Sequence, residues 1–151
     1  MILDNLDSNL LLVSIKPQFA ESIFRGEKTI ELRKSAPTRA GKDSYMLIYV
    51  TAPVKKVWGI CRIKSIIKET PIQLWEKHGQ KTGITKSEFN DYYKENKKAF
   101  GIEITDVKNF LENSIDLENL RNYFPGFSPP QTYGYLNTEL IDNSPLKELI
   151  S

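Results

Sequence analysis

Apolar residues in the first part of the chain change from a continuous run to helical spacing and then to alternation. Residues 10–15 (LLLVSI) are a short apolar run before Lys16-Pro17, and this length favours a buried strand over a helix. Over residues 17–25 the apolar positions fall at helical spacing, and Gly26 follows them as glycine typically follows a helix C-terminus. Over residues 29–33 apolar and polar residues alternate, which predicts a half-buried second strand.

The rest of the chain carries the same two periodicities. Residues 45–50 (YMLIYV) predict an inner strand, residues 54–67 alternate and predict a long strand, and residues 99–107 predict another. We expect helices at 71–78, 85–95 and 117–123, with Thr85 or Ser87 as the cap of the second. Residues 34–44 are predicted to be a loop, residues 128–136 extended chain, and the last residues a weak helix.

This order of elements favours an α+β fold or a small mixed β-barrel. The helices do not alternate with strands regularly enough for a doubly wound parallel sheet. The sequence contains no internal repeat, low-complexity tract or interdomain linker, and 151 residues suit one domain. We therefore predict a single domain over residues 1–151.

Composition favours a cytoplasmic protein that is not inserted in a membrane. No apolar stretch approaches the ~20 residues of a membrane span. The first nine residues (MILDNLDSN) are acidic and lack the basic start of a secretory signal. Cys61 is the only cysteine, so the chain has no internal disulfide, and we expect its thiol to be buried.

Charge is distributed unevenly along the chain. Residues 16–68 hold 12 Lys/Arg and 4 Asp/Glu, a net of +8, whereas the remaining residues hold 9 and 15, a net of −6. Such asymmetry suggests that an anionic partner such as nucleic acid meets the basic half. The alternative is that the two halves balance across one folded surface.

Several kinds of catalytic chemistry lack their residues in this sequence. His78 is the only histidine, which excludes a zinc site built from a cluster of His and Cys residues within one chain. No nucleophile elbow lies near it, and neither a Walker A motif nor GxGxxG is present. We expect no cofactor and no metal, although a nuclease with a carboxylate-bound metal stays open because acidic residues are plentiful.

A group of charged residues beside the second strand is the best candidate for a binding site. Alternation places Glu31 and Arg33 on the face opposite the apolar residues of that strand, together with Thr29. Lys28 precedes them at the turn. An arginine beside a glutamate is held rigid and still presents donors to a phosphate or a base. The alternative is a set of exposed ion pairs of little energetic value. Aromatic residues on the predicted strands are candidates for base stacking: Tyr45, Tyr49, Trp58, Tyr133 and Tyr135.

Residues 14–34 (SIKPQFAESIFRGEKTIELRK) resemble the opening of the ASCH domain, a member of the PUA-like superfamily. The shared pattern is an apolar strand, Lys-Pro, a helix and G-x-K-T-x-E-x-R. Residues 48–63, 99–110 and 129–136 resemble later segments, so the resemblance covers about residues 10–137 and leaves 138–151 as a C-terminal extension. The resemblance implies a small mixed β-barrel with surrounding helices and a cleft that binds RNA or a modified base. The resemblance implies Lys28, Glu31 and Arg33 as cleft residues, with Lys16 as their neighbour. The pattern of the residues themselves adds Thr29, Lys34 and Tyr133 as candidates for the same site.

Three functions are compatible with this resemblance. The first is a nucleic-acid-binding module that regulates transcription or RNA metabolism. The second is a hydrolase, either a ribonuclease or an amidohydrolase of N4-acetylcytidine, in which Lys28 and Glu31 would be catalytic. Glu31 stands where those amidohydrolases have a threonine, and Thr82 aligns with their later glutamate. The third is a protein-interaction domain whose cleft is vestigial.

Overall fold

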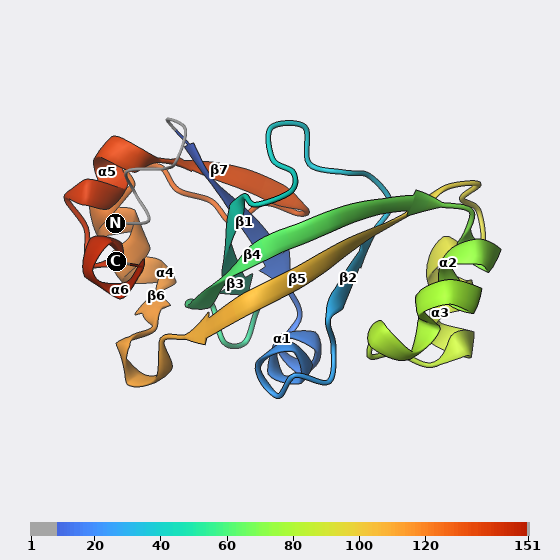
Figure 1. Ribbon diagram of the computed structural model, residues 1–151. Helices are drawn as coiled ribbons and strands as arrows, with labels where there is room; N and C mark the ends of the chain where they lie inside the picture. The colour runs from blue at the N-terminus through green and yellow to red at the C-terminus, as the bar shows by residue number, and fades with distance from the viewer. Residues whose placement is uncertain (1–8, 151) are drawn as a thin grey trace.

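The computed structural model describes residues 9–150, which form one mixed sheet flanked by helices (Figure 1). The strands are β1 (Asn9–Ile15), β2 (Ile30–Arg33), β3 (Tyr45–Val50), β4 (Lys56–Glu69), β5 (Ala99–Asn109), β6 (Ile115–Asp116) and β7 (Tyr133–Asn137). The α-helices are α1 (Pro17–Phe24), α2 (Pro71–His78), α3 (Lys86–Tyr93), α4 (Leu117–Tyr123), α5 (Thr138–Asp142) and α6 (Leu146–Ile150). The predicted α+β class is therefore confirmed.

The strand order is β2-β5-β4-β3-β1-β7, and β6 pairs with the start of β4. β1 and β3 are parallel, which α1 and β2 make possible by providing a long connection between them. The other pairs are antiparallel. β4 and β5 are the longest strands and connect the two ends of the molecule, with α2 and α3 at one end and α4, α5 and α6 at the other (Figure 1).

The sheet is open, so the predicted β-barrel is wrong. β2 and β7 are its edges, and among residues 9–150 neither pairs with the other. Arg33 at the end of β2 donates to the Ser14 carbonyl of β1 at 2.7 Å, and Tyr133 of β7 donates to the Ser35 carbonyl at 3.0 Å. A barrel requires a continuous backbone ladder. Here hydrogen bonds from side chains connect the two edge regions, and no backbone ladder joins them within the described chain.

β1 is buried on both faces and separates two apolar cores. Leu10 and Leu12 pack in the core that α4, α5 and α6 cover, whereas Leu11 and Val13 pack in the core beside α1. This explains why the strand reads as a continuous apolar run rather than an alternating one. A third core lies between β2 and the α2–α3 pair, and the site lies where the second and third cores meet the open edge.

Most predicted elements are confirmed, with small shifts at their ends. β3, α2 and α4 have the predicted bounds, and α3 begins with a capping box on Thr85 rather than on Ser87. β6 was missed because two residues are too few to show a periodic pattern. The predicted C-terminal extension is part of the fold, since Ile141, Leu146 and Ile150 are fully buried in the first core.

Cys61 is buried, as predicted, and burial raises the pKa of its thiol to about 12. None of the helices among residues 9–150 has the length and apolarity needed to span a bilayer. Residues 1–8, on which the prediction about a secretory signal mainly rests, lie outside the described part of the chain. The cytoplasmic location stays a prediction.

Candidate functional site

The turn between α1 and β2 brings the charged residues of the motif to the open edge of the sheet. Gly26 has a φ of 79°, a conformation that favours glycine, and it ends α1. The Lys28 amide then donates to the Ser22 carbonyl of α1 at 3.2 Å. In β2, Ile30 and Leu32 point into the third core, as the alternation predicts. Glu31 on the opposite face is also buried, so this face is not the solvated one that a half-buried strand implies.

A hollow of about 650 Å³ lies in front of this face, and we refer to it as the site cavity. It is enclosed by the end of β1, the start of α1, β2, the face of α3 and the segment that precedes β7. Its size is typical of a pocket for a small organic ligand or one nucleotide. Its lining includes Ser14, Lys16, Phe19, Lys28, Glu31, Arg33, Thr51, Asp91, Tyr92 and residues 130–132.

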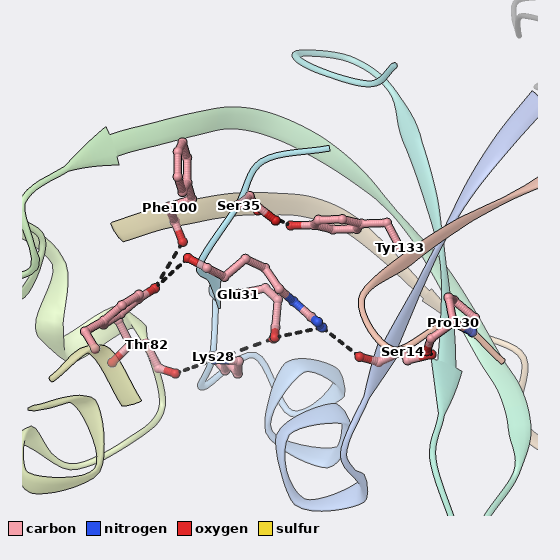
Figure 2. A network of polar contacts seen from close by, with 10 residues as sticks. Ser14, Lys28, Glu31, Ser35, Thr82, Phe100, Pro130 and Tyr133 are labelled. Carbon is pink, nitrogen blue, oxygen red and sulfur yellow. Dashed lines mark hydrogen bonds and ion pairs between the residues drawn. The ribbon is translucent and has the colours of Figure 1, made fainter. Parts of the chain in front are cut away.

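Lys28 is held almost out of solvent, with 3% of its surface exposed. Its Nζ donates to the Thr82 carbonyl at 2.6 Å and lies 3.7 Å from Oε2 of Glu31 (Figure 2). The ammonium also lies 5.4 Å from the ring centre of Phe19. Burial lowers the pKa of Lys28, an effect that the Glu31 carboxylate opposes and the Arg33 cation reinforces.

Glu31 lies between two cations. Its Oε1 is 3.3 Å from Nη2 of Arg33, which also donates to the Ser14 carbonyl. Glu31 and Arg33 are only 6% and 8% exposed. We refer to Lys28, Glu31 and Arg33 as the charged cluster; with all three ionised, its net charge is +1.

The hydrogen bonding of the charged cluster is incomplete. Oε2 of Glu31 and Nε of Arg33 are buried, and no atom of the described residues forms a hydrogen bond with them. Leaving such atoms unpaired costs free energy, and buried charged groups cost most. The cluster therefore has one free acceptor and one free donor, together with an excess positive charge.

Tyrosines fix the far side of the charged cluster. The Tyr93 hydroxyl donates to the Arg33 carbonyl at 2.9 Å, and the Arg33 guanidinium lies 5.5 Å from the ring centre of Tyr133. Burial raises the pKa of the Tyr133 hydroxyl, which stays protonated and donates to Ser35 (Figure 2). These contacts hold the guanidinium in one orientation.

The structure brings most of the predicted site residues together, but not all. Lys16 lines the site cavity from the start of α1. Thr29 lines a smaller hollow between α1 and β5 instead, so it does not join Glu31 and Arg33 in the site cavity. Lys34 is exposed, and its Nζ lies 4.7 Å from the ring centre of Tyr92 outside the cavity.

The sequence analysis named Thr82 only as the residue aligned with the glutamate of the amidohydrolases, and it missed Tyr92, which lines the site cavity from α3. Thr82 is fully buried, and its carbonyl binds Lys28 while its hydroxyl donates to the Gly79 carbonyl. A backbone acceptor leaves no trace in side-chain patterns. Tyr92 could have been predicted as a site residue only with the knowledge that α3 faces β2, and the sequence does not supply it. No group of three or more His, Cys, Asp or Glu residues within 9–150 is arranged to hold a metal ion.

Comparison with known proteins identifies the family to which this fold belongs. A family model described as a domain of unknown function, DUF365, matches residues 12–121. An ASCH domain-containing ribonuclease of Zymomonas mobilis is 29% identical over 133 residues, 88% of each chain. The chain is an ASCH domain protein of the DUF365 family.

The solved structure of ASCH from Zymomonas mobilis matches this ASCH protein with a TM-score of 0.85, over 95% of this chain and 96% of that one, at 29% identity. The shared fold thus extends beyond the residues that the family model matches. A large ribosomal subunit protein uL22 of Ureaplasma parvum is 30% identical over 93 residues, which are 61% of this chain but 29% of that protein.

Proposed function

We propose that this ASCH protein binds single-stranded RNA and holds one nucleotide in the site cavity. The observation that carries the proposal is the charged cluster, which is buried in the cavity wall with a net positive charge and two unpaired polar atoms. A nucleotide supplies what the cluster lacks, because its phosphate is anionic and its base edge carries both donors and acceptors. A base inside a duplex is stacked and paired, so a single strand fits a cavity better.

Each member of the cluster has a distinct expected role. Nε of Arg33 is the free donor, and the guanidinium geometry suits a phosphate or a base acceptor. Oε2 of Glu31 is the free acceptor, which suits a base N–H and repels phosphate. Lys28 supplies charge. This combination favours the recognition of a base by Glu31 and of a neighbouring phosphate by the cations.

Binding of a fluorescent single-stranded RNA, measured by anisotropy at two salt concentrations, tests this proposal. We expect affinity to fall as salt rises. Arg33→Met should weaken binding at least about tenfold, because it removes charge-assisted hydrogen bonds. Arg25→Ala is the matched control, since Arg25 is exposed beside Glu27 and outside the site cavity. Equal affinity of wild type and the folded Arg33 variant would place RNA elsewhere.

RNA cleavage is a second candidate function, and the Zymomonas relative named as a ribonuclease favours it. In cleavage by the ribose 2′-hydroxyl, the O2′–P bond forms, the P–O5′ bond breaks and one proton passes from O2′ to O5′. Glu31 would accept the proton from O2′, and Lys28 would offset the charge that builds on the phosphate oxygens. The products are a 2′,3′-cyclic phosphate and a 5′-hydroxyl.

Labelled RNA incubated with the protein, with and without EDTA, tests the cleavage candidate. We expect the wild type and Arg25→Ala to yield the cyclic phosphate, and Lys28→Met to be slower by about 100-fold or more. Products with a 3′-hydroxyl, or activity that is lost in EDTA, would contradict attack by the ribose 2′-hydroxyl and indicate a different cleavage mechanism. Absence of cleavage under both conditions would leave RNA binding as the function.

The other two hypotheses are less well supported. An amidohydrolase of N4-acetylcytidine would lack the usual threonine at Glu31, and the Thr82 hydroxyl and carbonyl are both engaged in hydrogen bonds. Release of acetate from N4-acetylcytidine would revive it. In a protein-interaction domain with a vestigial cleft, Glu31 and Arg33 would pair outside any pocket, whereas both line the site cavity. A regulatory role in transcription or RNA metabolism stays a prediction.

A further inference from the structure

Three cations lie over three tyrosine rings at the open edge of the sheet. Nζ of Lys34 is 4.7 Å from the centre of Tyr92, Cζ of Arg33 is 5.5 Å from that of Tyr133, and Cζ of Arg39 is 4.1 Å from that of Tyr135. We refer to these six residues as the cation–tyrosine row. Each pair places a positive charge against an aromatic ring, and the three pairs lie at the same edge of the sheet.

Two tyrosines of the row are neighbours. Tyr133 and Tyr135 are two residues apart on β7, so their side chains share one face, and both pack against the core beside α1. Both rings are half-buried, and packing against this core holds them in place.

The segment that carries the cations is fastened to the same strand. The Tyr133 hydroxyl donates to the Ser35 carbonyl at 3.0 Å (Figure 2), and the Arg39 amide donates to the Tyr135 hydroxyl at 3.2 Å. Residues 35–39 thus lie along β7 although about 100 positions separate them in sequence. Side-chain hydrogen bonds therefore hold this part of the predicted loop against β7.

The row leads out of the site cavity. Arg33 and Tyr92 line the cavity, whereas Arg39 and Tyr135 do not. Lys34 and Arg39 are exposed, and Tyr92 is 37% exposed. The outer part of the row is therefore accessible, begins at the cavity and carries positive charge throughout.

This composition matches what a single strand of nucleic acid requires. A basic groove follows the phosphates, and aromatic rings or arginine planes stack the bases. A guanidinium beside a tyrosine ring can stack on a base and donate its N–H groups to a phosphate. A protein partner would have no need for a cation over each successive ring.

We propose that the cation–tyrosine row binds the nucleotides that flank the one in the site cavity. The ligand is then a single-stranded oligoribonucleotide, and a free nucleotide fills only one end of the binding surface. This inference rests on the proposed RNA binding.

Affinity as a function of RNA length tests the inference separately from the proposed function. Mono-, tri- and hexaribonucleotides, and a duplex made from the hexamer, are titrated against the wild type. We expect the hexamer to bind at least about tenfold more tightly than the mononucleotide, and the duplex more weakly than the single strand. If none of them binds, the proposed function fails. If the mononucleotide binds as tightly as the hexamer, or the duplex as tightly as the single strand, the cation–tyrosine row does not bind flanking nucleotides. Only the proposal for the site cavity then stands.

Substitution at the outer end of the row locates the effect. Arg39→Ala should weaken hexamer binding about fivefold to tenfold and leave mononucleotide binding unchanged, and Arg39→Lys should recover only part of the loss. Lys64→Ala is the control, because Lys64 is exposed on β4 and belongs neither to the row nor to the cavity. Equal effects of Arg39→Ala and Lys64→Ala on the hexamer would show a diffuse charge effect and overturn the inference. Since Arg39 is exposed, its variants are expected to fold.

Discussion

Lys28, Glu31 and Arg33 are buried side by side although ionised groups gain more from water than from most protein interiors. Their mutual attraction offsets only part of the lost hydration, and two of their polar atoms have no hydrogen-bond partner within the described chain. A well-packed apolar trio at these positions would be as stable or more so. The charged cluster is therefore better explained by what it binds than by what it contributes to folding.

The net charge of the cluster predicts unequal effects of two isosteric substitutions. Glu31→Gln leaves two buried cations without an anion, whereas Lys28→Met leaves Glu31 paired with Arg33. We expect Glu31→Gln to lower the free energy of unfolding by about 3–5 kcal/mol and Lys28→Met by clearly less. Urea unfolding at neutral pH measures both. A larger loss for Lys28→Met would mean that its hydrogen bond to Thr82 outweighs the charge balance.

Cys61 predicts a pH dependence of stability. Its thiol has an ordinary pKa of 9.0 and a pKa of about 12 in the fold, so the folded state disfavours the thiolate. Its contribution is fully present below pH 9.0 and is lost as pH rises from there toward 12. Between pH 8 and 10 the wild type should lose about 1 kcal/mol more of its free energy of unfolding than Cys61→Ala. If the free energies of unfolding of the two proteins in urea showed the same dependence on pH, the raised pKa of the Cys61 thiol would be contradicted.

At the scale of elements, the local patterns were sufficient to place most strands and helices but not their partners. The alternation of β2 correctly separated Ile30 and Leu32 from Glu31, yet it implied that Glu31 faces solvent. Glu31 is buried because α3 and the segment before β7 enclose that face, and both come from more than 50 residues away. The open sheet was missed for the same reason, because long-range geometry decides whether the edge strands β2 and β7 pair, and no local pattern reports it.

The start of α3 provides a test of a local prediction. The Thr85 hydroxyl accepts from the Glu88 amide at 3.1 Å, and the Glu88 carboxylate accepts from the Thr85 amide at 3.0 Å. Thr85→Ala should therefore lower the free energy of unfolding by about 1 kcal/mol. Ser87→Ala, at the exposed second residue of the helix, should change it by less than about 0.5 kcal/mol. Equal effects in thermal or urea unfolding would rule out the capping box in solution.

At the scale of the whole molecule, three apolar cores support one open sheet, and the site cavity lies beside its edge strand β2. The C-terminal helices α4, α5 and α6 lie at the end of the long strands opposite α2 and α3 and cover the first core (Figure 1). None of their residues lines the site cavity. We therefore expect these helices to stabilise the scaffold.

The C-terminal helices should be essential for stability even though they lie outside the family model. Leu146 is fully buried, whereas Leu140 on the preceding helix is 41% exposed. Leu146→Ala is expected to cost about 2–5 kcal/mol in the free energy of unfolding, and Leu140→Ala far less. If both substitutions were near neutral, these helices would be an appendage.

A crystal structure with a short single-stranded RNA, protected from cleavage by 2′-O-methylation, tests the central claim most directly. The account predicts one nucleotide in the site cavity, with polar atoms within hydrogen-bond distance of Oε2 of Glu31 and Nε of Arg33. Its neighbours should lie along the cation–tyrosine row toward Tyr135. RNA bound on another face, with the charged cluster left as it is in the free protein, would contradict it.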